Sequence, residues 1–346
     1  MAAWATVCCR AILAVVMLGG TIELGAAGGG SGTLYSKLPQ VSAGTIERLT
    51  DVPWSGLPER PVDVWMPPGY PDQAPYAVLY MHDGQMLFDA EGSWNRQEWQ
   101  VDEVASRLQE SGAVRPFIVV AVHNLPASRH AEYQPQQPFE TLSEAAREAQ
   151  MAQRRDANTL LYDGPVRSDQ YVRFLVHGLK PLIDRRYAVS PDAESTMIMG
   201  SSMGGLVSWY AMLRYPGVFG AAACLSTHWP GGFPGAENPL DDALIEWFGQ
   251  HLPKPGNNRF WFDHGTATLD ALYGSLQTRA DAALGARLPG GGLAYGCLSW
   301  RAHEERAARR GSCDSCWAAR PPKTNPTQSS SLWVWGRSTL VFVGSE

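Results

Sequence analysis

The amino-acid sequence predicts an α/β protein built on a doubly wound, mostly parallel sheet with helices on both faces. Short runs of apolar and β-branched residues alternate along the chain with helical patterns, as expected when helices connect parallel strands. Several of these runs are apolar throughout, which is typical of strands buried on both faces. A chain of 346 residues, of which 45% are hydrophobic, can form one large domain of this class.

The predicted elements follow in chain order. Segments rich in apolar and β-branched residues are predicted as strands: 44–49, 62–66, 76–81, 117–122, 196–199, 220–225 and 259–263. Segments with helical spacing of apolar residues are predicted as helices: 98–108, 168–183, 206–213, 241–248 and 269–284. The early hairpin-like strands, followed by strand–helix alternation, predict a mixed sheet in a single domain over residues 44–310.

The region from 125 to 163 is long, polar and irregular. A long insertion in a compact sheet protein is often a lid or a binding loop. The alternative is a disordered surface excursion.

The two ends of the chain have different compositions from the middle. Arg10, the apolar run 11–18 and the small residues that follow predict a signal peptide over 1–27, and therefore a secreted or periplasmic protein. A Gly- and Ser-containing linker is predicted over 28–43. Residues 311–346 are predicted to be an atypical tail, either disordered or aberrant.

The composition excludes several classes of partner. The net charge of −6 argues against nucleic acid, which requires a basic surface. No stretch after the signal peptide is long and apolar enough to predict stable membrane insertion. Cys313 and Cys316 form a C-x-x-C without a second ligand pair, so no metal site is predicted. The oligomeric state cannot be inferred from the sequence.

The segment Gly200-Ser201-Ser202-Met203-Gly204 contains the pattern G-x-S-x-G. An apolar strand precedes it and a helical pattern follows, which is the context of a nucleophile elbow. Ser202 must adopt a strained backbone conformation there, and its neighbours two positions away come too close for a Cβ. The sequence therefore predicts Ser202 as the nucleophile; Ser201 competes but lacks the symmetric glycines.

A serine hydroxyl needs a base, and the base needs an orienting acid. In this architecture the partners follow the nucleophile in the order Asp or Glu, then His. His303 is the predicted base because every other histidine either precedes Ser202 or lies before or within the loop that should carry the acid. Asp270 is the favoured acid, and Asp263, at the end of the preceding strand, is the alternative.

Two backbone N–H groups should stabilise the oxyanion of the tetrahedral intermediate. One is that of Met203, directly after the nucleophile. The second is expected from the loop after the strand ending at Met81, where Gly84 permits a close approach. The N–H of Gln85 or Met86 is therefore the candidate.

Several segments together resemble the putative-esterase family of α/β hydrolases, which includes enterochelin-type, feruloyl and acetyl-xylan esterases, S-formylglutathione hydrolases and mycolyltransferases. The matching segments are His82-Asp83-Gly84-Gln85, Ala131-Glu132-Tyr133 after Arg129, Gly200 to Gly205, Ser226-Thr227-His228-Trp229 and Asp263-His264-Gly265-Thr266. The resemblance implies the α/β-hydrolase fold and ester hydrolysis through an acyl-serine, with no metal and no cofactor. The family pattern would place an amphipathic helix near the C-terminus, and the residues beyond roughly 286 depart from that pattern.

The substrate expected from this resemblance is a small-molecule carboxylic ester, as for enterochelin or feruloyl and acetyl esterases. Its pocket is predicted to include His82, Arg129, Tyr133, His228 and Trp229. The first alternative is an acyltransferase of the mycolyltransferase type, which uses the same triad. The second is a catalytically inactive binding module of the same fold.

Overall fold

A computed structural model describes residues 37–300, except 55, 94, 233–237, 255–257, 266–271 and 288–296, together with the segments 331–336 and 339–344. The predicted signal peptide lies outside the described residues and stays a prediction. The predicted acid Asp270 and base His303 also lie outside them.

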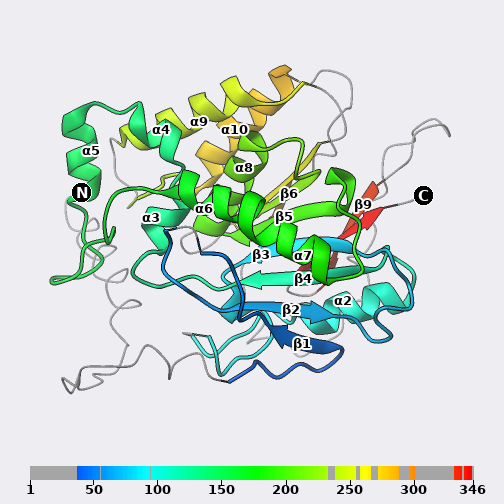
Figure 1. Ribbon diagram of the computed structural model, residues 1–346. Coiled ribbons are helices and arrows are strands. Elements are labelled where there is room, and N and C mark those ends of the chain that lie inside the picture. Colours follow the sequence, from blue (N-terminus) through cyan, green and yellow to red (C-terminus); the bar gives the residue numbers. More distant parts are fainter. Residues whose placement is uncertain are drawn as a thin grey trace, which may run out of the picture. The chain divides into compact units, whose positions relative to one another are not determined.

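Within the described residues the main sheet has eight strands in the order β1-β2-β4-β3-β5-β6-β7-β8 (Figure 1). Their bounds are β1 Thr45–Arg48, β2 Val62–Met66, β3 Ala77–His82, β4 Phe117–Val122, β5 Thr196–Ser201, β6 Ala221–Leu225, β7 Arg259–Gly265 and β8 Cys297–Trp300. Strand β2 runs antiparallel to β1 and β4, and all neighbours from β4 to β8 are parallel. The carboxyl ends of seven of these strands, all except β2, therefore lie at one edge. The predicted fold class is confirmed.

Helices connect these strands. Their bounds are η1 Gly84–Met86, α2 Val101–Glu110, α3 Arg129–Tyr133, α4 Gln136–Glu140, α5 Glu144–Met151, α6 Ser168–Phe174, η2 Leu175–Leu179, α7 Lys180–Arg186, η3 Ala193–Ser195, α8 Met203–Arg214, α9 Pro239–His251 and α10 Gly274–Arg287. The predicted helix over 168–183 is α6, a π-helical turn (η2) and α7 in succession. Gly178 lies in that turn, where a Cβ would come within 3.3 Å of both Phe174 and the Pro53 carbonyl oxygen. This close approach explains a glycine inside a helical segment.

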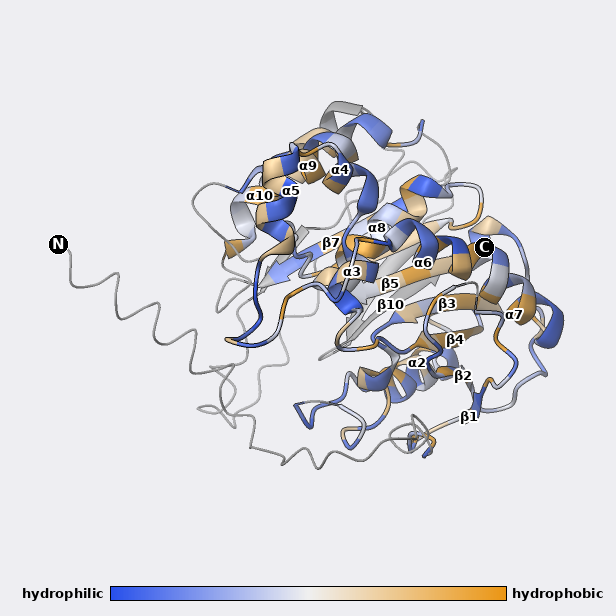
Figure 2. Cartoon of the chain, turned by 60° about the vertical axis from the view of Figure 1, so that its left-hand side comes forward, coloured by the Kyte–Doolittle hydropathy of each residue, from blue (hydrophilic) through white to orange (hydrophobic). Residues whose placement is uncertain are grey.

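Side chains on the two faces of the sheet enter two separate cores. Along β3, Val78 and Tyr80 pack in the larger core, on the face covered by α6, α7 and α8 (Figure 1). Leu79 and Met81 point the other way and pack with α2. Hydrophobic residues continue along β3 and β4 in Figure 2, as expected for strands covered on both faces.

The polar region 125–163 differs from its prediction. It contains three short helices, α3, α4 and α5, and much of it packs on the larger core through residues such as Tyr133, Phe139 and Tyr162. These helices are too short to show a clear apolar period in the sequence, so tertiary packing stabilises them. Among the described helices, none has the length and apolar character needed to cross a membrane.

Two strands lie within the predicted atypical tail. Strands β9 (Ser331–Gly336) and β10 (Thr339–Gly344) pair antiparallel, and β10 lies next to α2. In this tail the structure thus describes two strands, and that the tail is atypical for the family stays a prediction.

Candidate active site

The segment around Ser202 forms a sharp bend between β5 and α8. Ser202 has φ 59° and ψ −119°, a conformation that L-residues rarely adopt. Its hydroxyl makes no capping bond to the described residues of α8, and the side chain is partly exposed. The serine is thus held in a strained turn at the carboxyl edge of the sheet, with its hydroxyl not used for capping.

Two glycines make this bend sterically possible. A Cβ on Gly200 would lie 2.6 to 2.8 Å from the backbone of Gly204, closer than real Cβ contacts. A Cβ on Gly204 would lie 3.3 Å from a carboxylate oxygen of Asp83. Gly200 is therefore required by contacts within the bend, and a side chain at Gly204 would crowd the loop after β3.

The end of β6 holds the bend from the other side. The N–H of Ser202 donates to the Leu225 carbonyl at 2.8 Å, and the N–H of His228 donates to the Ser202 carbonyl at 3.2 Å. These two bonds connect the nucleophile's backbone to the neighbouring strand and its following loop. They stabilise a conformation that otherwise costs roughly 1–3 kcal/mol.

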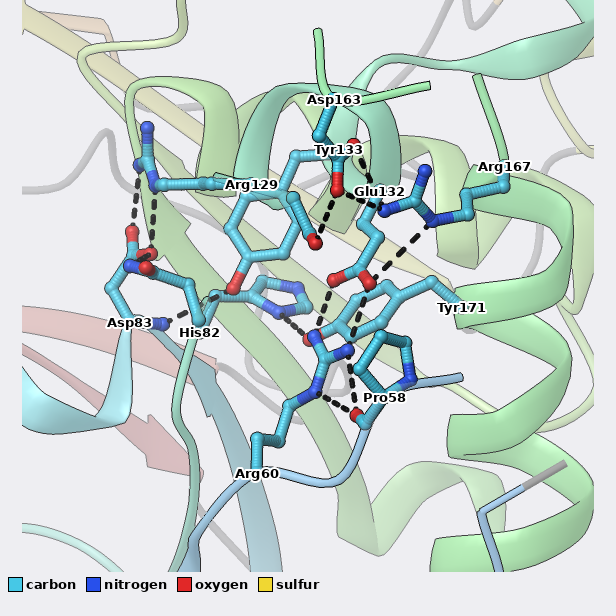
Figure 3. A network of polar contacts seen from close by, with 12 residues as sticks. Pro58, Arg60, His82, Asp83, Arg129, Glu132, Tyr133, Asp163, Arg167 and Tyr171 are labelled. Carbon is cyan, nitrogen blue, oxygen red and sulfur yellow. Dashed lines mark hydrogen bonds and ion pairs between the residues drawn. The ribbon is translucent and has the colours of Figure 1, made fainter. Parts of the chain in front are cut away.

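Asp83, on the loop after β3, faces the start of α8. Its Oδ1 accepts from Asn124 Nδ2 at 2.6 Å. The Arg129 guanidinium donates to both carboxylate oxygens, Nε to Oδ1 at 2.8 Å and Nη2 to Oδ2 at 2.7 Å (Figure 3). Burial would raise the pKa of Asp83, but the charge and hydrogen bonds of Arg129 and the bond from Asn124 outweigh it and lower that pKa. Asp83 is therefore an ionised, fully bonded anion.

A second buried ion pair lies behind the first. The side chains of Arg60 and Glu132 are both fully buried. Arg60 Nη1 donates to Glu132 Oε2, and Arg60 Nη2 donates to Glu132 Oε1 at 2.8 Å (Figure 3). Arg167 Nε approaches Glu132 at 3.7 Å. Because Glu132 lies on α3 beside Arg129, these contacts anchor the helix that carries Arg129.

His82 connects the two ion pairs through aromatic neighbours. Its Nδ1 hydrogen-bonds the Tyr171 hydroxyl at 2.9 Å, and its ring contacts Tyr133 with the centroids 5.2 Å apart. Burial lowers the pKa of His82 to about 4, so it is neutral at neutral pH. His82 and Tyr133 were predicted as pocket residues, but both side chains are buried in this network and are not open to solvent.

The loop after β3 is also where the second oxyanion donor was predicted. The N–H of Met86 donates to the Asp83 carbonyl at 2.8 Å, within the short helix η1. Gln85 lies one residue before Met86 in the same turn. Its N–H belongs to the first N–H groups of the short helix, which have no partner within a helix. The geometry therefore favours Gln85 over Met86. Met203 is the first residue of α8, whose first N–H groups are available for the same reason.

Asp263 and His228 already have bonding partners. Asp263 Oδ1 accepts from the Ser226 N–H at 2.8 Å, across the β6–β7 pair. His228 Nε2 donates to the Gly232 carbonyl and Nδ1 pairs with the Tyr273 hydroxyl, each at 2.7 Å. Burial lowers the pKa of His228 to about 4, so it stays neutral beside the bend.

Trp229 requires a correction. It was predicted to be a pocket residue, but its side chain is fully buried, stacked on Trp209 with the ring centroids 5.7 Å apart. Its Nε1 donates to Gln277 Oε1 at 2.8 Å. Trp229 is thus a core residue, because its indole fills the space between the sheet and α8, α9 and α10.

Sequence reasoning missed Asn124 and Arg60. Asn124 follows the end of β4, at the same edge of the sheet as Ser202, and that position could have indicated it. Arg60 precedes β2, which lies between β1 and β4, and no local pattern indicated a role for it. Within the described residues, no cluster of His, Cys, Asp or Glu is arranged to hold a metal ion.

Comparisons with known proteins agree with this architecture. A family model described as "Putative esterase" matches residues 58–268. The uncharacterized protein YbbA of Bacillus subtilis (strain 168) is 25% identical over 172 residues, which is 49% of this chain and 58% of that protein's length.

Solved structures share the fold at low identity. The BES protein from Bacillus cereus has a TM-score of 0.52 and 14% identity, with 77% of this chain and 92% of that chain covered. An IroE-like serine hydrolase from Shewanella oneidensis has a TM-score of 0.49 and 19% identity, with 74% and 73% covered. The strand order and the likeness to the BES protein support an α/β-hydrolase fold.

Proposed function

This chain belongs to the putative-esterase family, and on that premise we propose that it hydrolyses small or medium carboxylic esters through an acyl-serine at Ser202. The observation that carries the proposal is the strained left-handed backbone of Ser202, between a buried strand and a helix that its hydroxyl does not cap. Such a hydroxyl is presented to a substrate rather than used in the fold.

The topology supports the predicted partners of Ser202. Strands β5, β6, β7 and β8 are consecutive and parallel, so their carboxyl ends lie at one edge. Ser202 follows β5, Asp263 ends the β6-paired part of β7 with Asp270 beyond it, and His303 follows β8 by three residues. This is the chain order Ser, Asp, His that is typical of α/β hydrolases.

The proposed reaction runs in two steps. Ser202 Oγ attacks the ester carbonyl while His303 takes its proton, and the oxyanion is stabilised by the N–H groups of Met203 and Gln85. His303 then protonates the leaving alcohol, and Asp270 (or Asp263) orients its ring. In the second step His303 deprotonates a water molecule, which attacks the acyl carbon. As the bond from that carbon to Ser202 Oγ breaks, His303 returns the proton to Oγ, and the acid and free Ser202 are released.

A labelling experiment tests the proposal. Wild type, Ser202→Ala and Ser201→Ala are treated with a fluorophosphonate probe and assayed on p-nitrophenyl esters of increasing acyl length. We expect labelling and hydrolysis in wild type and Ser201→Ala, and neither in Ser202→Ala, because Ser202 is the serine that has the positive φ of the bend. Labelling that survives Ser202→Ala would refute the assignment.

The same assays separate the two alternatives. An acyltransferase would transfer the acyl group to an added alcohol faster than to water. An inactive binding module would show neither labelling nor turnover in wild type. The acyl-length series gives the substrate size, which depends on the loops around the bend.

A further inference from the structure

The geometry points to Arg129 as a positioning residue that aligns the two walls of the oxyanion hole. One wall is the turn from Asp83 to Met86, which carries Gln85, and the other is the start of α8, which carries Met203. This inference rests on the proposed function, because it assigns Arg129 a role in the reaction at Ser202.

Arg129 holds the first wall through Asp83. Its guanidinium bonds both carboxylate oxygens of Asp83, at 2.8 and 2.7 Å. Asp83 itself has a left-handed backbone, with φ 58° and ψ 44°, and its carbonyl accepts the bond that closes η1. The Arg129 guanidinium thus holds Asp83, the first residue of the turn that presents Gln85, in its left-handed conformation.

Arg129 reaches the second wall directly. Its Nη2 also lies 3.4 Å from the carbonyl oxygen of Ser201, the residue before the nucleophile. The same Asp83 oxygen that accepts from Nη2 lies 3.3 Å from where a Cβ of Gly204 would be. The ion pair therefore lies against both walls at once, and a change in its geometry would move one wall relative to the other.

Arg129 is itself held in place. Its guanidinium lies over the ring of Tyr133, 5.3 Å from the centroid. Glu132, three residues after Arg129 on α3, is bonded to Arg60 in the fully buried ion pair. The guanidinium is thus fixed from behind, which a positioning residue requires.

The pair also controls charge at the site. An unpaired Asp83 carboxylate beside the first turn of α8 would oppose the negative charge that develops on the substrate oxygen. Arg129 neutralises it with planar, two-point bonding, which lysine cannot reproduce. We therefore expect the loss of Arg129 to be worse than the loss of the whole pair.

The test compares Arg129→Met, Arg129→Lys, Asp83→Asn and the double variant Arg129→Met/Asp83→Asn on neutral p-nitrophenyl acetate and anionic p-nitrophenyl hemisuccinate. Arg186→Met is the matched control, because Arg186 pairs with Glu47 and Asp51 at the surface. We expect Arg129→Met to lower kcat roughly 100-fold with KM unchanged on both esters. Arg129→Lys should recover part of this loss.

The double variant gives the decisive comparison. Its kcat should exceed that of Arg129→Met, because removing Asp83's charge relieves the repulsion, whereas a purely structural role predicts a further loss. If Arg129→Met does not fold, the single variant Asp83→Asn must lower kcat at constant KM, and a wild-type kcat would overturn the inference.

Other outcomes overturn it as well. A KM increase confined to the hemisuccinate would make Arg129 a substrate-binding residue. Wild-type kcat in Arg129→Met, with Ser202→Ala inactive, would overturn the positioning role alone. Full activity in Ser202→Ala would overturn the proposed function and this inference together.

Discussion

Replacing Gly200 with alanine tests the steric reasoning behind the bend. The added Cβ would lie 2.6 Å from the carbonyl carbon, 2.7 Å from the oxygen and 2.8 Å from the Cα of Gly204. All three are rigid backbone atoms, so β5 and α8 must separate by roughly 0.6–0.8 Å to restore an ordinary contact near 3.4 Å. We expect a loss of about 1–3 kcal/mol in the free energy of unfolding, as for overpacked interiors.

The catalytic consequence should be larger than the loss of stability. The same displacement moves Ser202 relative to the oxyanion donors, and a misplacement near 1 Å lowers rates roughly 100-fold. Urea denaturation gives the stability, and kcat/KM on p-nitrophenyl acetate gives the activity. Gly217→Ala is the control, since a Cβ there would meet nothing within 4 Å. Wild-type stability and kcat/KM in Gly200→Ala would refute the reasoning.

Three further predictions concern stability, each measured by urea denaturation. Arg60→Met should lower the free energy of unfolding by about 3 kcal/mol, because it leaves Glu132 buried with only the more distant Arg167. Gly285→Ala in α10 should raise it by roughly 0.5–1 kcal/mol, since a Cβ there meets nothing within 4 Å and alanine favours helix. In wild type, lowering the pH from 6.5 to 4 should reduce the free energy of unfolding by about 3 kcal/mol through His82. The reason is that the His82 imidazole takes up a proton in the unfolded chain, whereas the buried ring stays neutral in the folded protein. His82→Gln should remove that part of the pH dependence.

Each of these predictions can fail on a definite result. An Arg60→Met protein as stable as wild type would mean that the buried pair contributes nothing net. A destabilised Gly285→Ala protein would contradict the open space around that position. An unchanged slope between pH 6.5 and 4 in His82→Gln would show that the ring does not keep its lowered pKa.

The region 125–163 shows where sequence reasoning reached its limit. Its polar composition predicted an irregular lid or disorder, yet Glu132 and Tyr133 are fully buried in helix α3. A buried glutamate is unfavourable unless a cation meets it, and Arg60 lies 72 residues earlier in the chain. No local pattern could have predicted that pairing.

The sequence by itself determined strands β1 to β7 and the bend at Ser202, whereas β8, β9 and β10 were not predicted. Apolar runs mark buried strands because burial on both faces leaves no place for polar side chains. The glycines around Ser202 mark the bend because the steric conflict lies within residues 200 to 204. Both signals are local, so they can be read before the chain is folded.

Only the tertiary structure decided the environment of the site. Asp83 and Arg129 are 46 residues apart, and nothing in either segment specifies the other. Trp229 looks like a pocket residue in its motif and is a core residue in the fold. Charge pairing and burial depend on which elements meet, so they arise only when the sheet and its helices are assembled.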